Sequence, residues 1–178
     1  NKISIMQLSK DGQKVVGSKI SIDCDCLGMS GGWTPAVHLF TQSGGKLKFR
    51  DDDQVFIPDT YPSDQISIGS CNGEFTLDEI LTGISKKLKN FLNIKKTEYE
   101  NLEIQSHFNK TKRNIWLLPS DKIIGKTKPF VDYQNDATAK DIKLALREGF
   151  RSIEHVKRYT TTGMGTDQGK LGNMHALG

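Results

Sequence analysis

The residues best suited to bind a ligand lie near the end of this sequence, where cations, hydroxyls and glycines are crowded together. Residues 157–170 place lysine and arginine beside consecutive threonines and a Gly-x-Gly turn. Glycines leave backbone N–H groups accessible, and cations and hydroxyls complement phosphate oxygens. We therefore expect a phosphate or an acidic partner to bind at Lys157, Arg158, Thr160, Thr161, Thr162 and Lys170. A solvated helix end is the alternative interpretation.

A second candidate site is the small-residue turn at 69–73, between a predicted strand at 66–68 and a predicted helix. Thr76 and Glu79 form a capping box, and apolar residues then recur at helical spacing as far as residue 92, with lysines 86, 87 and 89 on the outer face. Such a connection directs N–H groups and a positive helix end at one point, which favours pyrophosphate. A tight connection without a ligand fits equally well. The residues concerned are Gly69, Ser70, Asn72 and Gly73.

A Ser-Gly-Gly segment is a weaker candidate, because its backbone can approach a ligand or another strand closely. It consists of Ser30, Gly31 and Gly32. Cys24 and Cys26 precede it, but Cys-x-Cys is a poor zinc pattern without a second Cys or His pair at suitable spacing. We expect both thiols on one face of a strand, buried as small apolar groups, and no metal site.

The elements that must position these residues are short. Two β-branched runs, 3–8 and 15–22, flank an Asp-Gly pair, which predicts a hairpin. A short helix at 36–42 and strands at 46–49 and 54–57 follow. Near the end, Thr138 and Asp141 predict a capped helix that stops at Gly149, with Ile142, Ala145 and Leu146 inward. Ser152 predicts the start of a second helix, which Gly163 ends.

The composition limits the function classes. The chain has 178 residues, 35% of them apolar, and a formal net charge of +4, which suits one domain or two small ones. Positive charge is not dense enough for nucleic-acid binding, and no apolar run reaches the roughly 18 residues of a membrane span. Three cysteines form no disulfide framework, so we expect a cytoplasmic location. Because the chain starts without Met and ends in an incomplete helical pattern, we expect a piece of a longer protein.

Three stretches resemble the alpha subunit of heterotetrameric sarcosine oxidase. Residues 23–45 resemble its D-x-L-x-x-S-G-G-W-x-P-x-x-H-L segment, and residues 68–81 resemble the final strand and helix of its nucleotide domain. Residues 130–173 match F-V-D-x-Q-N-D and E-H-V-K-R-Y-T-T-x-G-M-x-T-D-Q-G-K. The resemblance implies an α+β chain: the end of an NAD-binding domain at 1–94, a linker at 95–127, and a small helical domain at 128–178.

The helical domain is similar to bacterioferritin-associated ferredoxins, in which four cysteines hold a [2Fe–2S] cluster. The matching positions here are Asp132, Gln134, Asp167 and Gly172. None of these residues supplies a thiolate, so we expect the fold without an iron–sulfur cluster.

The resemblance implies a flavoenzyme of four different subunits. Sarcosine would be oxidised at FAD in the beta subunit, with electrons passing to FMN at the alpha–beta interface and then to oxygen, and tetrahydrofolate would accept the one-carbon unit. The turn at 69–73 and the 30–32 segment would then line an NAD site, and the cluster at 157–170 would lie near FMN. Partners would be the beta, gamma and delta subunits, and this chain alone would be inactive.

Other functions also fit the sequence. A related amino-acid or opine oxidase subunit is one alternative, although those relatives usually keep the cluster cysteines. A binding module with no redox partner is another. A ferredoxin-like electron carrier would require the missing thiolates.

Overall fold

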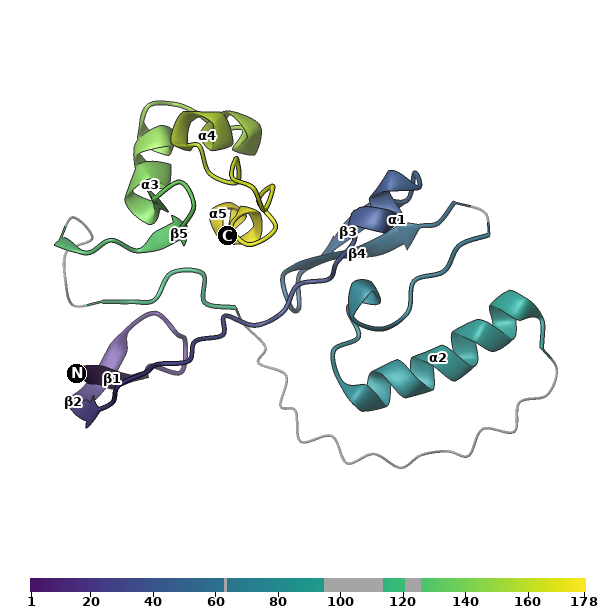
Figure 1. Ribbon diagram of the computed structural model, residues 1–178, viewed down its shortest axis with the longest axis horizontal. Helices are drawn as coiled ribbons and strands as arrows, with labels where there is room; N and C mark the ends of the chain where they lie inside the picture. The colour runs from purple at the N-terminus through teal and green to yellow at the C-terminus, as the bar shows by residue number, and fades with distance from the viewer. Residues whose placement is uncertain (63, 95–113, 121–125) are drawn as a thin grey trace. The chain divides into compact units, whose positions relative to one another are not determined.

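The chain forms two compact units, each of which combines small strand pairs with helices (Figure 1). The computed structural model describes residues 1–62, 64–94, 114–120 and 126–178. One unit comprises Asn1–Leu27 with Ile115–Gly178, and the other is Gly28–Asn114. This confirms the predicted α+β class. The predicted linker at 95–127 lies mostly outside the described residues.

The N-terminal hairpin pairs β1 (Lys2–Leu8) with β2 (Val15–Asp23) in antiparallel register, as predicted. Ile3 lies opposite Ile22 and Ile5 lies opposite Ile20, so isoleucines gather on one face. Three of these side chains are exposed, Ile20 by 56%, Ile5 by 45% and Ile22 by 41%, whereas Ile3 is half-buried. Because the sheet has two strands, β1 and β2 each have one edge without a strand partner in the described sheet.

The cysteines beside the hairpin are not where the sequence predicted them. Strand β2 ends at Asp23, so Cys24 and Cys26 lie beyond the ladder that would have set their faces. Cys24 is half-buried and Cys26 is exposed, and neither forms a disulfide. The prediction of two buried thiols on one strand face is therefore wrong.

The second unit begins with α1 (His38–Gln42) and an antiparallel pair of β3 (Lys46–Arg50) with β4 (Val55–Thr60). Its buried apolar side chains are Phe40, Val55 and Ile57. The predicted strand at 66–68 is wrong, because among the described strands β3 and β4 pair only with each other. Residues 65–68 instead lead without ladder bonds into the 3-10 helix η1 (Gly69–Asn72).

Helix α2 (Leu77–Leu92) follows this turn, and its predicted capping box is confirmed. The Thr76 hydroxyl accepts from the Glu79 N–H at 3.3 Å, and the Glu79 carboxylate accepts from the Thr76 N–H at the same distance. Asn93 ends the helix in the left-handed conformation at φ 52°.

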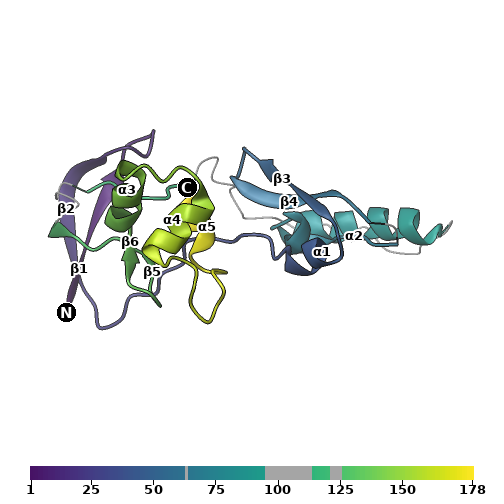
Figure 2. The same cartoon turned by 90° about the horizontal axis from the view of Figure 1, so that it is seen from above.

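The C-terminal part combines β5 (Phe130–Asp132) and β6 (Ala137–Thr138) with three helices: α3 (Ala139–Arg147), α4 (Ile153–Thr160) and α5 (Asn173–Leu177). Helices α3 and α4 pack together (Figures 1 and 2). Their shared core is small and comprises Ala137, Ala145 and Val156. Among the described residues, none of the helices has the length and apolar character required to cross a membrane.

The ends of α3 and α4 partly follow prediction. Thr138 and Asp141 form the predicted capping box, and Gly149 follows the helix at φ 97°. Leu146 was expected inward but is 48% exposed. Ser152 precedes α4 without a side-chain cap bond. Thr161, at φ 60°, ends α4 two residues before the predicted Gly163.

Candidate functional site

The turn that connects η1 to α2 encloses a carboxylate from its own sequence. Glu74 Oε2 accepts from the Gly69 N–H at 2.9 Å, and Oε1 accepts from Asn72 Nδ2 at 3.0 Å and Lys87 Nζ at 2.7 Å. The Glu74 side chain is 19% exposed and that of Lys87 is 32% exposed. We call Gly69, Asn72 and Lys87 the Glu74 cradle. Three donors of different origin thus converge on one half-buried anion.

The charge of Glu74 is stabilised in this position. Burial raises the pKa of its carboxyl group, but the hydrogen bonds from Lys87, Gly69 and Asn72 together outweigh that effect. The net pKa is lowered, so Glu74 is ionised and pairs with Lys87 at neutral pH.

Side chains from outside the turn fix its backbone. Arg50 Nη2 donates to the Gly73 carbonyl at 2.8 Å, and its Nε donates to Asp53 Oδ1 at 2.7 Å. Tyr61 donates from its hydroxyl to Asn72 Oδ1 at 3.0 Å. Gly73 has φ +76°, and a Cβ there would lie 2.7 Å from Arg50 Nη2, so only glycine fits. The cradle is therefore held by strand β3 and the segment after β4 as well as by α2.

The sequence located this turn but did not identify most of its partners. Glu74, Arg50 and Tyr61 were missed, and Lys87 was wrongly placed on the outer face of α2. Helical spacing could have corrected Lys87, since it stands three residues after Ile84 and seven after Ile80, on their face. Arg50 and Tyr61 carry no comparable local signal.

Several of the N–H groups at this turn are engaged within the chain. Gly69 donates to Glu74, Gly73 donates to the Ser70 carbonyl at 3.0 Å, and the N–H of Phe75 donates to Glu79 at 3.3 Å. Ser70 itself is exposed. The 30–32 segment is also exposed, and its Gly32 N–H donates to Ser30 Oγ at 3.4 Å.

A second cluster centres on the buried Asp132, which is 6% exposed. Its carboxylate accepts from the N–H of Gly163 at 2.7 Å, of Gln134 at 2.8 Å and of Asn135 at 3.3 Å, and from Asn135 Nδ2 at 3.1 Å. Burial raises the pKa of this carboxyl group, but the bond from Gly163 and those from Asn135 and Gln134 outweigh burial and lower it overall. Asp132 thereby joins the strand β5 turn to the loop after α4.

Hydrogen bonds from neighbouring positions hold the same loop. Gln134 Oε1 accepts from Thr166 N at 2.7 Å and from Thr166 Oγ1 at 2.9 Å. Asp167 accepts from the N–H of Gly169 and of Leu171. A Cβ on Gly172 would lie 3.2 Å from the Val131 carbonyl oxygen. Within the described part of the chain, no group of three or more His, Cys, Asp or Glu residues is arranged to hold a metal ion.

The predicted cluster at 157–170 divides into a buried and an exposed set. Thr160 and Thr162 are 9% and 1% exposed, and their hydroxyls share a 2.7 Å hydrogen bond inside the unit. Arg158 forms an ion pair with Glu154 at 3.4 Å. The remaining members are half-buried or exposed: Lys157, Thr161 and Lys170. The buried threonines therefore shape the turn, and the side chains that reach solvent are Lys157, Arg158, Thr161 and Lys170.

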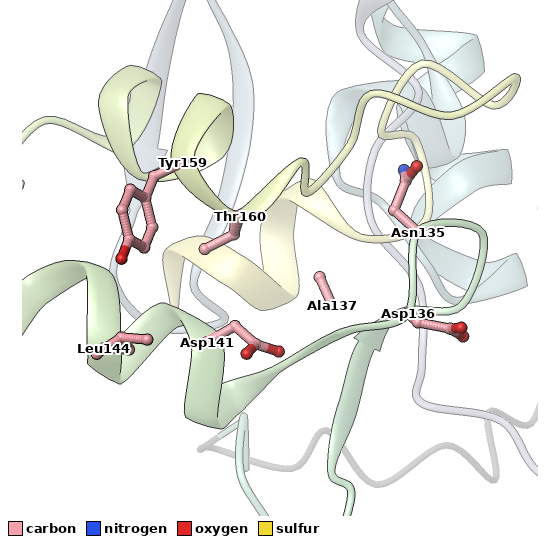
Figure 3. Close-up of a pocket in the computed structure, with 7 residues that line it drawn as sticks. All are labelled: Asn135, Asp136, Ala137, Asp141, Leu144, Tyr159 and Thr160. Atoms are coloured by element: carbon pink, nitrogen blue, oxygen red, sulfur yellow. The ribbon is translucent and has the colours of Figure 1, made fainter.

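A shallow pocket of about 280 Å³ lies between α3 and α4 (Figure 3). Tyr159 from α4 lies over Leu144 from α3, and the Asp136 side chain points away from them (Figure 3). Asp141 also lines the pocket, but one of its oxygens accepts from the Thr138 N–H at 2.8 Å and hydroxyl at 2.6 Å. These bonds, led by the hydroxyl, lower the pKa of Asp141. The pocket touches the predicted cluster through Thr160.

Comparison with known proteins finds similarity to sarcosine oxidase alpha subunits. Residues 126–178 match the sarcosine oxidase A3 domain. The sarcosine oxidase subunit alpha of Rhizobium meliloti (strain 1021) is 33% identical over 173 residues, which are 91% of this chain and 16% of that protein. Its counterpart from Corynebacterium sp. (strain P-1) is 30% identical over 182 residues, covering 99% of this chain and 18% of the relative. The chain thus spans less than a fifth of these relatives.

Proposed function

Because this chain belongs to the sarcosine oxidase alpha subunit family, we propose that it is part of the alpha subunit of a flavin-dependent sarcosine oxidase. That enzyme would demethylate sarcosine to glycine, with oxygen as electron acceptor and tetrahydrofolate as one-carbon acceptor. The observation that carries the proposal is 30–33% identity along nearly the whole chain to proteins named for this activity. Since the chain spans less than a fifth of those relatives, the chain alone would not catalyse the reaction.

The proposed contribution of the second unit is to the NAD site of the subunit. The turn formed by Gly69, Ser70, Asn72 and Gly73 stands before a capped helix, where anions are stabilised. Its backbone is fixed by Arg50, which supports a preorganised site. Ser30, Gly31 and Gly32 are exposed and provide a further proposed contact.

The proposed contribution of the helical part is to the FMN site and the interface with the beta subunit. Lys157, Arg158, Thr161 and Lys170 would face the flavin phosphate, and Thr160 and Thr162 would hold the turn from inside. FAD would be in the beta subunit, the gamma and delta subunits would complete the assembly, and the location would be cytoplasmic. We propose no iron–sulfur cluster, since no cysteine stands at Asp132, Gln134, Asp167 or Gly172.

The test is to purify the complete alpha subunit containing this chain together with its co-expressed partner subunits. We expect a flavin absorption spectrum that sarcosine bleaches under anaerobic conditions and that oxygen restores. Opines serve as the control substrates. Bleaching by opines but not by sarcosine would assign the chain to a related opine oxidase. Absence of flavin from the purified assembly would favour the alternative that the chain is a non-catalytic interaction module.

A further inference from the structure

The Glu74 cradle has the donor set of an anion site that the chain fills with its own carboxylate. A backbone N–H from Gly69, a side-chain amide from Asn72 and an ammonium group from Lys87 meet at Glu74 within 2.7–3.0 Å. Phosphate oxygens accept the same kinds of hydrogen bond and carry at least as much charge. The cradle is therefore complementary to phosphate as well as to carboxylate.

Two of the three donors also have contacts that do not involve the Glu74 side chain. Asn72 also contacts the Tyr61 hydroxyl at 3.0 Å, and the Lys87 ammonium also donates to the Ser67 carbonyl at 3.3 Å. Arg50 binds the Gly73 carbonyl next to the turn. These contacts remain if the Glu74 side chain moves away, so the cradle would keep its geometry for another anion.

Helix α2 leaves room for the Glu74 carboxylate at a glycine. A Cβ on Gly83 would lie 3.0 Å from Glu74 Oε2 and 3.2 Å from Oε1. Glycine inside a helix is less favourable than alanine. A side chain at position 83 would, however, press on the carboxylate, and it would press equally on a phosphate that took the same place, so the glycine keeps this place open for an anion.

We propose that Glu74 is a built-in competitor at a phosphate site, which a dinucleotide pyrophosphate occupies by taking over the hydrogen bonds of Gly69, Asn72 and Lys87. The inference rests on the proposed NAD contact at this turn and adds how that contact is controlled. Glu74 raises the ligand concentration needed for binding, because the incoming phosphate must first displace it. The affinity for the ligand is then set by how much more strongly the donors bind phosphate than they bind the Glu74 carboxylate.

The test is calorimetric titration of the 178-residue chain with inorganic pyrophosphate. Glu74→Gln keeps the side-chain length and removes the charge that competes for Lys87, so we expect affinity to rise about tenfold or more. Adding Lys87→Gln should abolish the gain. Glu148→Gln, an exposed carboxylate in the other unit, changes the net charge equally and serves as the control. A folded Glu74→Gln chain that binds no tighter than this control would overturn the proposal.

A second variant covers the case in which Glu74→Gln does not fold. Glu74→Ala, which removes the competing carboxylate and leaves every donor in place, should also strengthen pyrophosphate binding, while circular dichroism confirms that the chain is folded. If neither variant folds, the Glu74 carboxylate is required for the stability of the fold and the proposal is wrong. In the complete subunit, NAD bound elsewhere despite a pyrophosphate gain would contradict only the proposed NAD contact. NAD bound at this turn without any effect of Glu74→Gln would contradict only the competitor role.

Discussion

At the scale of single residues, two buried or half-buried carboxylates organise the chain. Glu74 gathers donors in one unit and Asp132 gathers donors in the other. Neither was identified as an organising group from sequence, because each has one partner far along the chain: Lys87 is 13 residues from Glu74 and Gly163 is 31 from Asp132. Sequence patterns identify caps and turns over four residues, whereas these pairings depend on tertiary packing.

Removing the charge of Asp132 should destabilise the helical part. Asp132→Asn keeps the shape, but an amide replaces one acceptor oxygen with a donor that faces the N–H of Gly163 or Asn135. Hydrogen bonds to charged groups contribute about 1.5–3 kcal/mol each, so we expect a loss of about 2–4 kcal/mol in urea unfolding. The exposed Asp136→Asn, at φ 53° where Asn is well tolerated, is the control. Equal stability of both variants would contradict this assignment.

The exposed cations at the end of α4 should affect flavin retention. If the proposed FMN site is correct, Lys157→Ala with Arg158→Ala in the proposed oxidase assembly should lower FMN content and leave FAD unchanged. Each desolvated contact to phosphate contributes about 1.5–3 kcal/mol, and much less where it is exposed. Lys86→Ala with Lys89→Ala, two exposed cations on α2, removes the same charge. Full FMN occupancy with normal assembly would show that Lys157 and Arg158 lie at a solvated helix end and do not contact the flavin.

At the scale of elements, features that depend on a few neighbouring residues were predicted correctly, whereas the pairing of strands was predicted less well. Both capping boxes formed at the expected residues, because Thr76 with Glu79 and Thr138 with Asp141 need only one helical turn. The strand at 66–68 failed because a strand requires a neighbour that no local pattern supplies. Family resemblance, carried by whole motifs, identified the relatives that spacing alone could not.

The two helix caps of the C-terminal part should differ in strength. Thr138→Ala removes a hydroxyl that bonds Asp141 and should cost about 0.5–2 kcal/mol. Ser152→Ala should cost less, because Ser152 makes no side-chain cap bond to α4. Urea unfolding followed by circular dichroism compares the two variants directly. A larger loss for Ser152→Ala would contradict the observed cap geometry.

At the scale of the whole molecule, both units should be sensitive to acid. Glu74, Asp132 and Asp141 all have lowered pKa values in the folded chain. Their stabilisation is therefore complete above the unfolded pKa of about 4 and is lost as pH falls through the folded values. We expect urea midpoints to decline between pH 5 and pH 3, and Asp132→Asn to weaken that decline in the helical part.

Each unit contains one tryptophan, which allows the acid response to be resolved. Trp33 belongs to the 28–114 unit and Trp116 to the other. Trp33→Phe leaves fluorescence that reports the unit of Asp132, and Trp116→Phe leaves a signal for the unit of Glu74. A urea midpoint that stays constant from pH 5 to pH 3 in both variants would contradict the lowered pKa values.

The isoleucine face of the N-terminal hairpin has a practical consequence for handling the 178-residue chain. Exposed apolar side chains beside open strand edges form a template for edge-to-edge pairing, so we expect aggregation that increases with protein concentration. Ile20→Thr retains a β-branched residue on the strand and makes that face polar. Light scattering over a dilution series should show a lower aggregation rate for this variant, which would make it the better starting material for crystallisation or NMR.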